Sequence, residues 1–221
     1  MDPLPQESTD LEVAAITARL PLPHFRRILD VCCGSGRHAA PLSAARYEVT
    51  GIDRDETALA AARQRAPDAT FHRMDQRAFG QLVGPFDAAL LLWQSFGYFA
   101  PDDNDGVLRD IATLLRPGGR FLLDLFHPEY FRRRQGRRSN LRPGVQAIED
   151  SFENERLRSR IVYEDGSVEW MDFEVFAPEQ IAARAKTAGL DLLETCCWWD
   201  AQRAPDPDES RYQVMFERRS S

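Results

Sequence analysis

Short apolar runs alternate with segments of helical periodicity between residues 28 and 126. Each run has the length of a buried strand, and the run at 86–92 is apolar on both of its faces except for Asp87. Such a strand is typical of a parallel sheet that helices cover on both sides. The alternation predicts an α/β fold with a mostly parallel sheet. The predicted strands are 28–33, 47–52, 69–72, 86–92 and 121–126, and the predicted helices run to about residue 46, over 56–65 and from 102 to about 115.

The pattern changes to alternating polar and apolar positions between residues 145 and 177. This pattern predicts three antiparallel strands, and Asp165-Gly166 is a strong hairpin signal before the last of them. A helix at 179–188 then leads to two further strands, which we expect to pair as a hairpin in the main sheet. The three antiparallel strands are expected at 145–152, 155–163 and 168–176, and the final two at 190–199 and 211–218.

One helix is predicted before the first strand. Ser8, Thr9 or Asp10 can cap it, apolar residues from Leu11 to Leu20 recur at helical spacing, and prolines follow. The helix either covers a ligand site or packs against the sheet edge. We expect four parts in the chain: an N-terminal helical cap at 1–24, a ligand-binding core at 25–126, an antiparallel insertion at 127–177, and a C-terminal helix and hairpin at 178–221 that complete the core sheet.

Composition limits the classes of partner. The chain of 221 residues is 43% hydrophobic and 29% charged, as expected for one soluble domain, and its net charge of −7 argues against a nucleic-acid surface. No apolar run approaches the ~20 residues of a membrane span. The acidic start, MDPLPQESTD, is unlike a signal peptide, so we expect a cytoplasmic protein. Cysteines occur only as the adjacent pairs Cys32-Cys33 and Cys196-Cys197, for which we expect free thiols and no metal site.

A glycine turn follows the first predicted strand. Gly34 and Gly36 permit positive φ and close approach of a ligand, and the next helix offers unpaired N–H groups. Asp53 ends the second strand, where a carboxylate can accept from both hydroxyls of a ribose. Two cofactors fit this unit. Gly34-x-Gly36-x-x-Ala39 matches the dinucleotide fingerprint, whereas Asp30 favours S-adenosylmethionine (SAM), because a carboxylate there repels a pyrophosphate and attracts an ammonium or a sulfonium.

The segment Asp30-Val31-Cys32-Cys33-Gly34-Ser35-Gly36 resembles motif I, D-x-x-x-G-x-G, of class I SAM-dependent methyltransferases. Leu115-Arg116-Pro117-Gly118-Gly119 is similar to the L-x-P-G-G segment before strand five of that family. The resemblance covers the whole chain. It implies a three-layer, Rossmann-like fold with a seven-stranded, mostly parallel sheet, an antiparallel C-terminal hairpin and a small three-stranded antiparallel lid.

The resemblance also implies the cofactor site, with S-adenosylhomocysteine as the product form. Asp30 would bind the amino group of the methionine end, Asp53 the ribose and Asp75 the adenine amine. For Asp75 a plain helix N-cap is the alternative. The cofactor-binding residues expected are Asp30, Cys32, Gly34, Ser35, Gly36, Asp53, Arg54, Met74, Asp75, Gln76 and Trp93.

The acceptor site is expected at the aromatic loop after 86–92 and under the lid, because ligands of open α/β sheets bind outside the carboxyl ends of the strands. The loop lacks the Asn-Pro-Pro-Tyr or Asp-Pro-Pro-Tyr tip of adenine-N6 and glutamine methyltransferases, which favours a small-molecule acceptor. We expect Gln94, Ser95, Phe96, Tyr98 and Trp170 to bind it. His127 and Tyr130 follow strand five and are the candidate bases, although His127 can equally be a turn residue.

The predicted function is therefore transfer of the sulfonium methyl group of SAM to a nitrogen or oxygen of a small molecule, by a monomer or a homodimer. Two alternatives stay open. One is an NAD-dependent oxidoreductase, and the other is a protein that binds SAM without catalysis.

Overall fold

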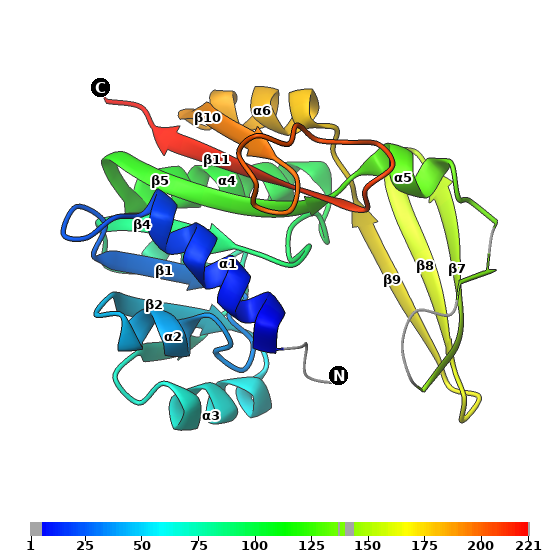
Figure 1. Cartoon of the computed structure of the whole chain (residues 1–221), viewed down its shortest axis with the longest axis horizontal. Helices are drawn as coiled ribbons and strands as arrows, with labels where there is room; N and C mark the ends of the chain where they lie inside the picture. The colour runs from blue at the N-terminus through cyan, green and yellow to red at the C-terminus, as the bar shows by residue number, and fades with distance from the viewer. Residues whose placement is uncertain (1–5, 137, 140–143, 221) are drawn as a thin grey trace.

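A seven-stranded sheet forms the centre of the computed structural model, which describes residues 6–136, 138–139 and 144–220. The strand order is β10-β11-β5-β4-β1-β2-β3. Strands β1 to β5 run parallel, and β11 is antiparallel to both of its neighbours (Figure 1). The predicted mostly parallel sheet with its antiparallel hairpin is confirmed. The strands are β1 (Arg27–Val31), β2 (Glu48–Asp53), β3 (Thr70–Arg73), β4 (Phe86–Leu91), β5 (Leu115–Phe126), β10 (Leu190–Cys196) and β11 (Arg211–Arg218).

Helices cover both faces of this sheet and make the three layers. On one face Leu59 and Ile16 are fully buried in a cluster with residues of β1 and β4, and on the other face Ile111 and Ile181 are fully buried in a second cluster. The first face carries α1 (Gln6–Arg19), α2 (Ala39–Ala44) and α3 (Glu56–Arg65), and the second carries η1 (Phe79–Gln81), α4 (Pro101–Leu114) and α6 (Pro178–Thr187). Asp55 caps α3 as the sequence indicates, accepting from the N–H of Thr57 at 2.8 Å.

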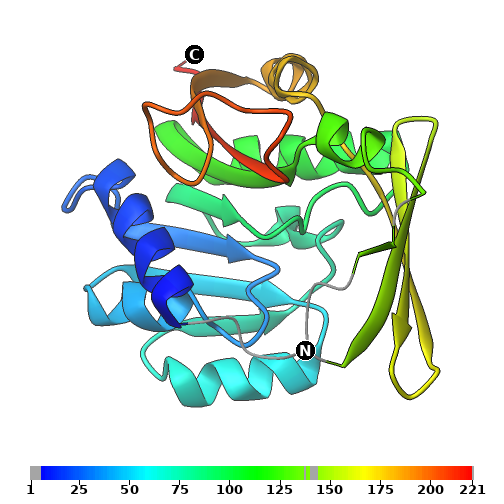
Figure 2. The same cartoon turned by 45° about the vertical axis from the view of Figure 1, so that its right-hand side comes forward.

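A separate antiparallel sheet stands beside the carboxyl edge of the main sheet (Figures 1 and 2). The three predicted strands are present, with a short fourth strand at one edge. Short helix α5 lies against β7. We call this sheet the lid; its strands are β6 (Arg138–Ser139), β7 (Val145–Glu153), β8 (Arg156–Tyr163) and β9 (Val168–Glu174), and α5 is Pro128–Arg132.

Two predictions about local structure are wrong. Helix α1 begins at Gln6, before the proposed caps Ser8, Thr9 and Asp10, and Leu11 on its expected apolar face is 73% exposed. The buried stripe instead includes Thr9, Glu12, Ile16 and Leu20, so polar groups of this helix face inward. A glutamate in the interior needs a partner, since glutamate is almost never fully buried unless it is paired.

Strand β5 also begins earlier than predicted, at Leu115 instead of Phe121. The Pro-Gly-Gly segment is part of this strand and forms an irregularity in its pairing with β4 instead of a reversal before it. Gly118, with φ +71°, adopts the conformation that this irregularity requires. Within the part of the chain that the structure describes, no helix is long and apolar enough to span a membrane.

Candidate functional site

The glycine turn after β1 has the conformation that its sequence predicts. Gly34 and Gly36 have φ of +53° and +73°. A Cβ atom at Gly34 would meet no atom within 4 Å, so this face of the turn is open to a ligand. A Cβ at Gly36 would lie 3.0 Å from Cβ of Ala62, so this glycine lets α3 pack closely. Asp53 supports the turn, because its Oδ2 accepts from the N–H of Gly34 at 2.9 Å.

Asp30 is buried at the end of β1 directly below this turn. Its side chain is 2% exposed, and Oδ2 has no hydrogen-bond partner among the described residues. Burial raises the pKa of Asp30 to about 6, although the charges of His38 and Arg37 act in the opposite direction. A buried carboxylate with a free oxygen is suited to a cationic hydrogen-bond donor.

Helix α1 brings Glu12 into the same region, and the sequence reading missed this residue. One oxygen of Glu12 lies 2.7 Å from Nε2 of His38 and 2.8 Å from the guanidinium of Arg37, and the other accepts from the indole N–H of Trp93 at 2.8 Å. Burial alone would raise the pKa of Glu12, but the hydrogen bond from His38 and the charge of Arg37 outweigh it, so the pKa is lowered. Helix α1 therefore contacts the end of β4, and its predicted role as the cover of a ligand site stays a prediction.

Trp93 and Gln94 form the tip of β4 in an unusual conformation. Both have positive φ, 57° and 54°, which non-glycine residues seldom adopt. Asp124 of β5 holds both: Oδ2 accepts from the N–H of Trp93 at 3.1 Å, and its carbonyl accepts from the N–H of Gln94 at 3.2 Å. Asp124 is 1% exposed and paired with Arg211. An acid inside the apolar run 121–126 is the same signal that singled out Asp30, and it could have identified Asp124.

The remaining residues predicted for the cofactor line the ends of β1, β2 and β3. Asp75 is half-buried after β3 and binds Arg77 through both oxygens, each at 2.9 Å. This pair lowers the pKa of Asp75 to about 2, with the Arg77 hydrogen bond as the largest cause. Asp75 caps no helix, since residues 76 to 78 are not helical. Cys32 and Met74 pack against the core, Arg54 is exposed, Ser35 binds Arg65, and Gln76 donates to the carbonyl of Ser95 at 3.0 Å.

The predicted acceptor residues do not all face one space. Tyr98 packs on Phe173 of the lid, with ring centroids 5.4 Å apart. Burial raises the pKa of Tyr98, and the charges of Cys32 and Glu169 act in the same direction. Trp170 is 59% exposed and lies on the opposite face of β9 from Phe173. The two residues are three positions apart, and successive side chains of a strand point to opposite faces.

Gln94 and Phe96 are buried in the structure. Gln94 is 2% exposed, and its amide is bonded to the backbone of Phe96 and Phe126. Phe96 is fully buried and packs on Phe176 at 5.4 Å. Ser95 lies between them and accepts from Gln76 through its carbonyl. In this conformation Gln94 and Phe96 shape the tip of β4, and their contact with an acceptor stays a prediction.

His127 lies at the end of β5 and is 6% exposed. Burial lowers its pKa, and its Nδ1 has no hydrogen-bond partner among the described residues. The His127 and Tyr212 rings pack in a T-shaped arrangement with their centroids 5.7 Å apart. Tyr130 of α5 packs on Phe131, and the guanidinium of Arg134 lies over the Tyr130 ring, 3.7 Å from its centroid.

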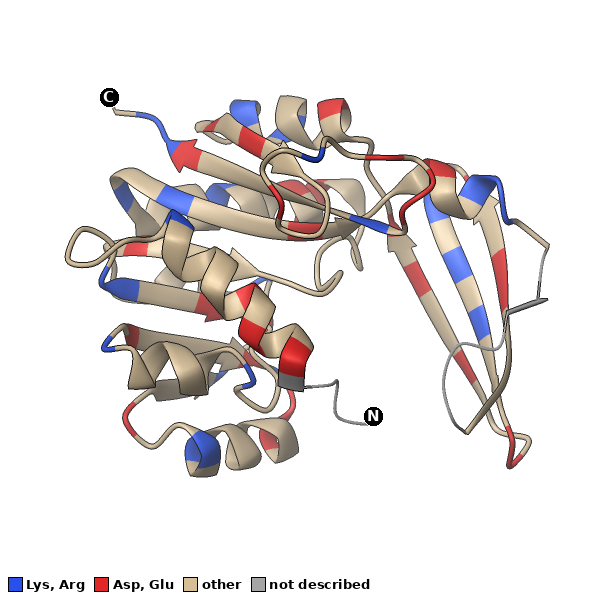
Figure 3. Cartoon of the chain, in the orientation of Figure 1, with Lys and Arg blue, Asp and Glu red and all other residues tan. Residues whose placement is uncertain are grey.

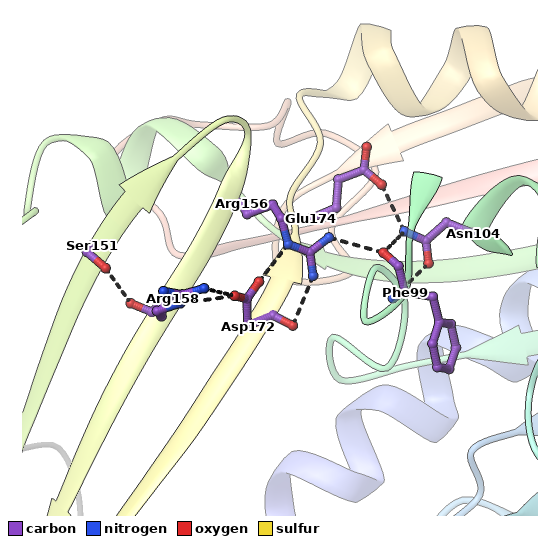
Figure 4. A network of polar contacts seen from close by, with 7 residues as sticks. All are labelled: Phe99, Asn104, Ser151, Arg156, Arg158, Asp172 and Glu174. Carbon is purple, nitrogen blue, oxygen red and sulfur yellow. Dashed lines mark hydrogen bonds and ion pairs between the residues drawn. The ribbon is translucent and has the colours of Figure 1, made fainter. Parts of the chain in front are cut away.

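The lid is tied to the loop after β4 by a polar network (Figure 4). Asp172 accepts from Arg156 at 2.6 Å and from Arg158 at 2.7 Å, and Arg156 also donates to the carbonyl of Phe99 at 3.1 Å. Asn104 of α4 donates to the same carbonyl and to Glu174. The arginines of β8 recur at every second residue, so they lie on one face of the lid, and Figure 3 marks their positions along the strand as blue bands. Leu157 lies on the other face and packs in a cluster with Phe173.

The central part of the chain is similar to one protein family. Residues 28–119 match the family described as "Methyltransferase domain". The dTDP-3-amino-3,4,6-trideoxy-alpha-D-glucopyranose N,N-dimethyltransferase of Streptomyces venezuelae is 33% identical over 111 residues, which are 49% of this chain and 46% of that protein. The chain thus spans about half the length of such curated relatives. The dTDP-4-amino-2,3,4,6-tetradeoxy-D-glucose N,N-dimethyltransferase of Saccharopolyspora spinosa is 26% identical over 78% of this chain and 74% of its own.

Solved structures extend the similarity to nearly the whole chain. The CcbJ methyltransferase from Streptomyces caelestis has a TM-score of 0.80 at 17% identity, covering 98% of this chain and 91% of that one. SAM-bound CalS10 from Micromonospora echinaspora, an amino pentose methyltransferase, has a TM-score of 0.74 at 22% identity, covering 96% and 91%. The expected class I SAM-dependent methyltransferase fold is confirmed.

Proposed function

We propose that this protein, whose residues 28–119 match a methyltransferase domain, transfers the methyl group of SAM to a nitrogen or oxygen of a small-molecule acceptor. The observation that carries the proposal is Asp30. Its carboxylate is 2% exposed, has one oxygen without a partner among the described residues, and lies at the open glycine turn. A ligand with a cationic amino group satisfies that oxygen, and the methionine end of SAM carries one.

The residues around the turn fit the rest of the cofactor. Asp30 would accept from the amino group, Asp53 from the ribose and Asp75 from the adenine amine, and each retains acceptor capacity beside the bonds it makes here. When bound, SAM supplies an activated methyl group on a sulfonium. The protein contributes alignment and exclusion of water, for which the closed position of α1 over Trp93 is suited.

An amine is the acceptor group that we favour. The relatives from S. venezuelae and S. spinosa are, by their names, N,N-dimethyltransferases of amino sugars. Next to the β4 tip, the rings of Phe126 and Phe173 pack with centroids 5.7 Å apart, and Tyr98 packs on Phe173, so the surface there is apolar. An amine must be neutral to react, and His127, whose pKa burial lowers, would be uncharged at neutral pH and able to accept a proton. Tyr130 is the second candidate.

We further propose a cytoplasmic monomer or homodimer that acts on no nucleic acid, with the four-part division 1–24, 25–126, 127–177 and 178–221. In this division the first part covers the cofactor and the third part covers the acceptor. The contacts of Glu12 with Trp93, and of Tyr98 with Phe173, support these two roles.

Calorimetric titration with S-adenosylhomocysteine and, separately, with NAD tests the proposed cofactor. We expect binding of S-adenosylhomocysteine and none of NAD, because the carboxylate of Asp30 opposes a pyrophosphate. Binding of NAD alone would refute the proposal in favour of an oxidoreductase. Turnover of radiolabelled SAM with a panel of amino sugars would then separate a catalyst from a protein that only binds SAM.

A further inference from the structure

The indole of Trp93 is held by side chains from both sides of β4. The guanidinium of Arg211 lies over the ring, 3.9 Å from its centroid, and that of Arg37 lies 4.9 Å from it. Arg37 follows β1, whereas Arg211 begins β11, and these strands lie on opposite sides of β4 in the sheet. Guanidinium groups at these distances attract an aromatic ring, so the two arginines restrict where the indole can lie.

The backbone of Trp93 also needs contacts that hold it in place. Two consecutive non-glycine residues with positive φ, Trp93 and Gln94, are unfavourable and persist only where surrounding contacts hold them. Asp124 provides those contacts by accepting from the N–H of both residues, one through its side chain and one through its carbonyl.

Asp124 in turn depends on β11. Its carboxylate is 1% exposed and accepts from Nε and Nη2 of Arg211 and from Nε2 of Gln213 at 3.1 Å. A carboxylate this deeply buried requires an opposite charge and several hydrogen bonds. Arg211 supplies that charge and at the same time covers the indole, so the position of the β4 tip is coupled to one residue of the C-terminal hairpin.

We propose that Arg211 is a positioning residue for cofactor binding, acting through Asp124 and Trp93 to fix the tip of β4 beside the glycine turn. This inference rests on the proposed function, in which Trp93 borders the cofactor. It makes β11, which lies outside residues 28–119, a working part of the SAM site. The hairpin then contributes to binding as well as completing the sheet.

The indole N–H resonances of the full chain test the contact without any ligand. The chain has four tryptophans, so ¹⁵N-tryptophan labelling should give four indole signals, and Trp93→Phe identifies the relevant one. We expect Arg211→Lys to shift that signal, because lysine keeps the charge that Asp124 needs but has no planar group to cover the ring. Arg218→Lys, on the same strand but bonded to the carbonyl of Thr113, is the matched control and should leave the signal in place. An unshifted Trp93 signal in Arg211→Lys would overturn the proposal.

A double-mutant cycle in the affinity for S-adenosylhomocysteine tests the function. Arg211→Lys should weaken binding by about three- to tenfold in the wild-type background, and by less than about twofold when Trp93 is already Ala, because alanine removes the ring that Arg211 covers. Arg218→Lys should change neither affinity. Equal losses in both backgrounds would mean that Arg211 does not act through Trp93, and would overturn this inference alone. Failure of the wild-type protein to bind S-adenosylhomocysteine would overturn the proposed function with it.

Discussion

The indole N–H of Trp93 donates to the carboxylate of Glu12 at 2.8 Å, although 81 positions separate the two residues in the chain. This bond joins the N-terminal helix to the tip of β4. Because Glu12 also contacts Arg37 and His38 beside the glycine turn, one side chain links the three segments that would surround the methionine end of a bound cofactor.

Glu12→Gln should loosen α1. The amide can still accept from Trp93 but lacks the charge that pairs with Arg37, and a hydrogen bond to a charged group is worth about 1.5–3 kcal/mol. We expect amide hydrogen exchange in α1 to become about tenfold faster, with the main sheet unchanged. Glu7→Gln, an exposed residue in the first turn of the same helix, is the control. Unchanged exchange in α1 of the Glu12 variant would show that other contacts hold the helix.

Asp30→Asn should stabilise the protein without ligand. The pKa of Asp30 is raised by burial from 3.8 to about 6, and at 1.36 kcal/mol per unit its charge costs about 3 kcal/mol at pH 7.5. Replacement by the isosteric amide should raise the free energy of unfolding by about 1–3 kcal/mol in a urea titration while weakening the binding of S-adenosylhomocysteine. Asp191→Asn, at an exposed ion pair of the hairpin, should do neither. A destabilised Asp30→Asn protein would contradict the inferred cost of this charge.

The affinity for S-adenosylhomocysteine should rise with pH. Folding raises the pKa of Asp30 to about 6. The protonated carboxyl therefore contributes its full stability to the free protein below about pH 4, and this contribution is lost as the pH rises toward 6. Only the ionised carboxylate pairs with an ammonium group, so binding should strengthen between about pH 5 and 7. Calorimetry across this range would measure it. The Asp30→Asn protein should show a flatter profile, and identical profiles for the two proteins would exclude Asp30 as the titrating group.

Asp53→Ala should abolish detectable SAM binding. The substitution removes the acceptor proposed for the ribose and also the bond that Oδ2 accepts from Gly34 at 2.9 Å, which supports the glycine turn. Asp55→Ala, two residues further on, removes only the cap of α3 and should cost about 1 kcal/mol of stability with affinity retained. Micromolar SAM affinity in the Asp53 variant would show that the ribose is held elsewhere.

Local patterns were sufficient to predict the sheet, most helix positions and the glycine turn. Strand length, apolar runs and signals such as Asp55 or Asp165-Gly166 act within a few residues, and the structure follows them. Irregular pairing is less visible. The irregularity in β5 depends on its register with β4, so the pattern predicts the strand only from Phe121 and leaves Pro117-Gly118-Gly119 before it.

The missed site residues depend on contacts that are distant in the sequence. Glu12 lies in a helix whose apolar periodicity is weak, so the sequence does not show which way its side chain points. Its contact with Trp93 is visible only in the folded chain. Arg211 begins an edge hairpin, and its pairing with Asp124 follows from the antiparallel order of β11 and β5. Asp124 was the one such residue with a local signal, because an acid within a buried strand needs a partner.

The N–H of Glu174 donates to the carbonyl of Gly97 at 2.8 Å, and a Cβ at Gly97 would lie 2.3 Å from the carbonyl oxygen of Glu174. The last strand of the lid therefore rests directly on the loop that follows the β4 tip. With Arg156 bonded to the carbonyl of Phe99 as well, the lid and the loop that follows the β4 tip are joined at two points. We expect the lid and this loop to open together when the methylated product leaves, so that product dissociation would follow a single exponential in stopped-flow measurements.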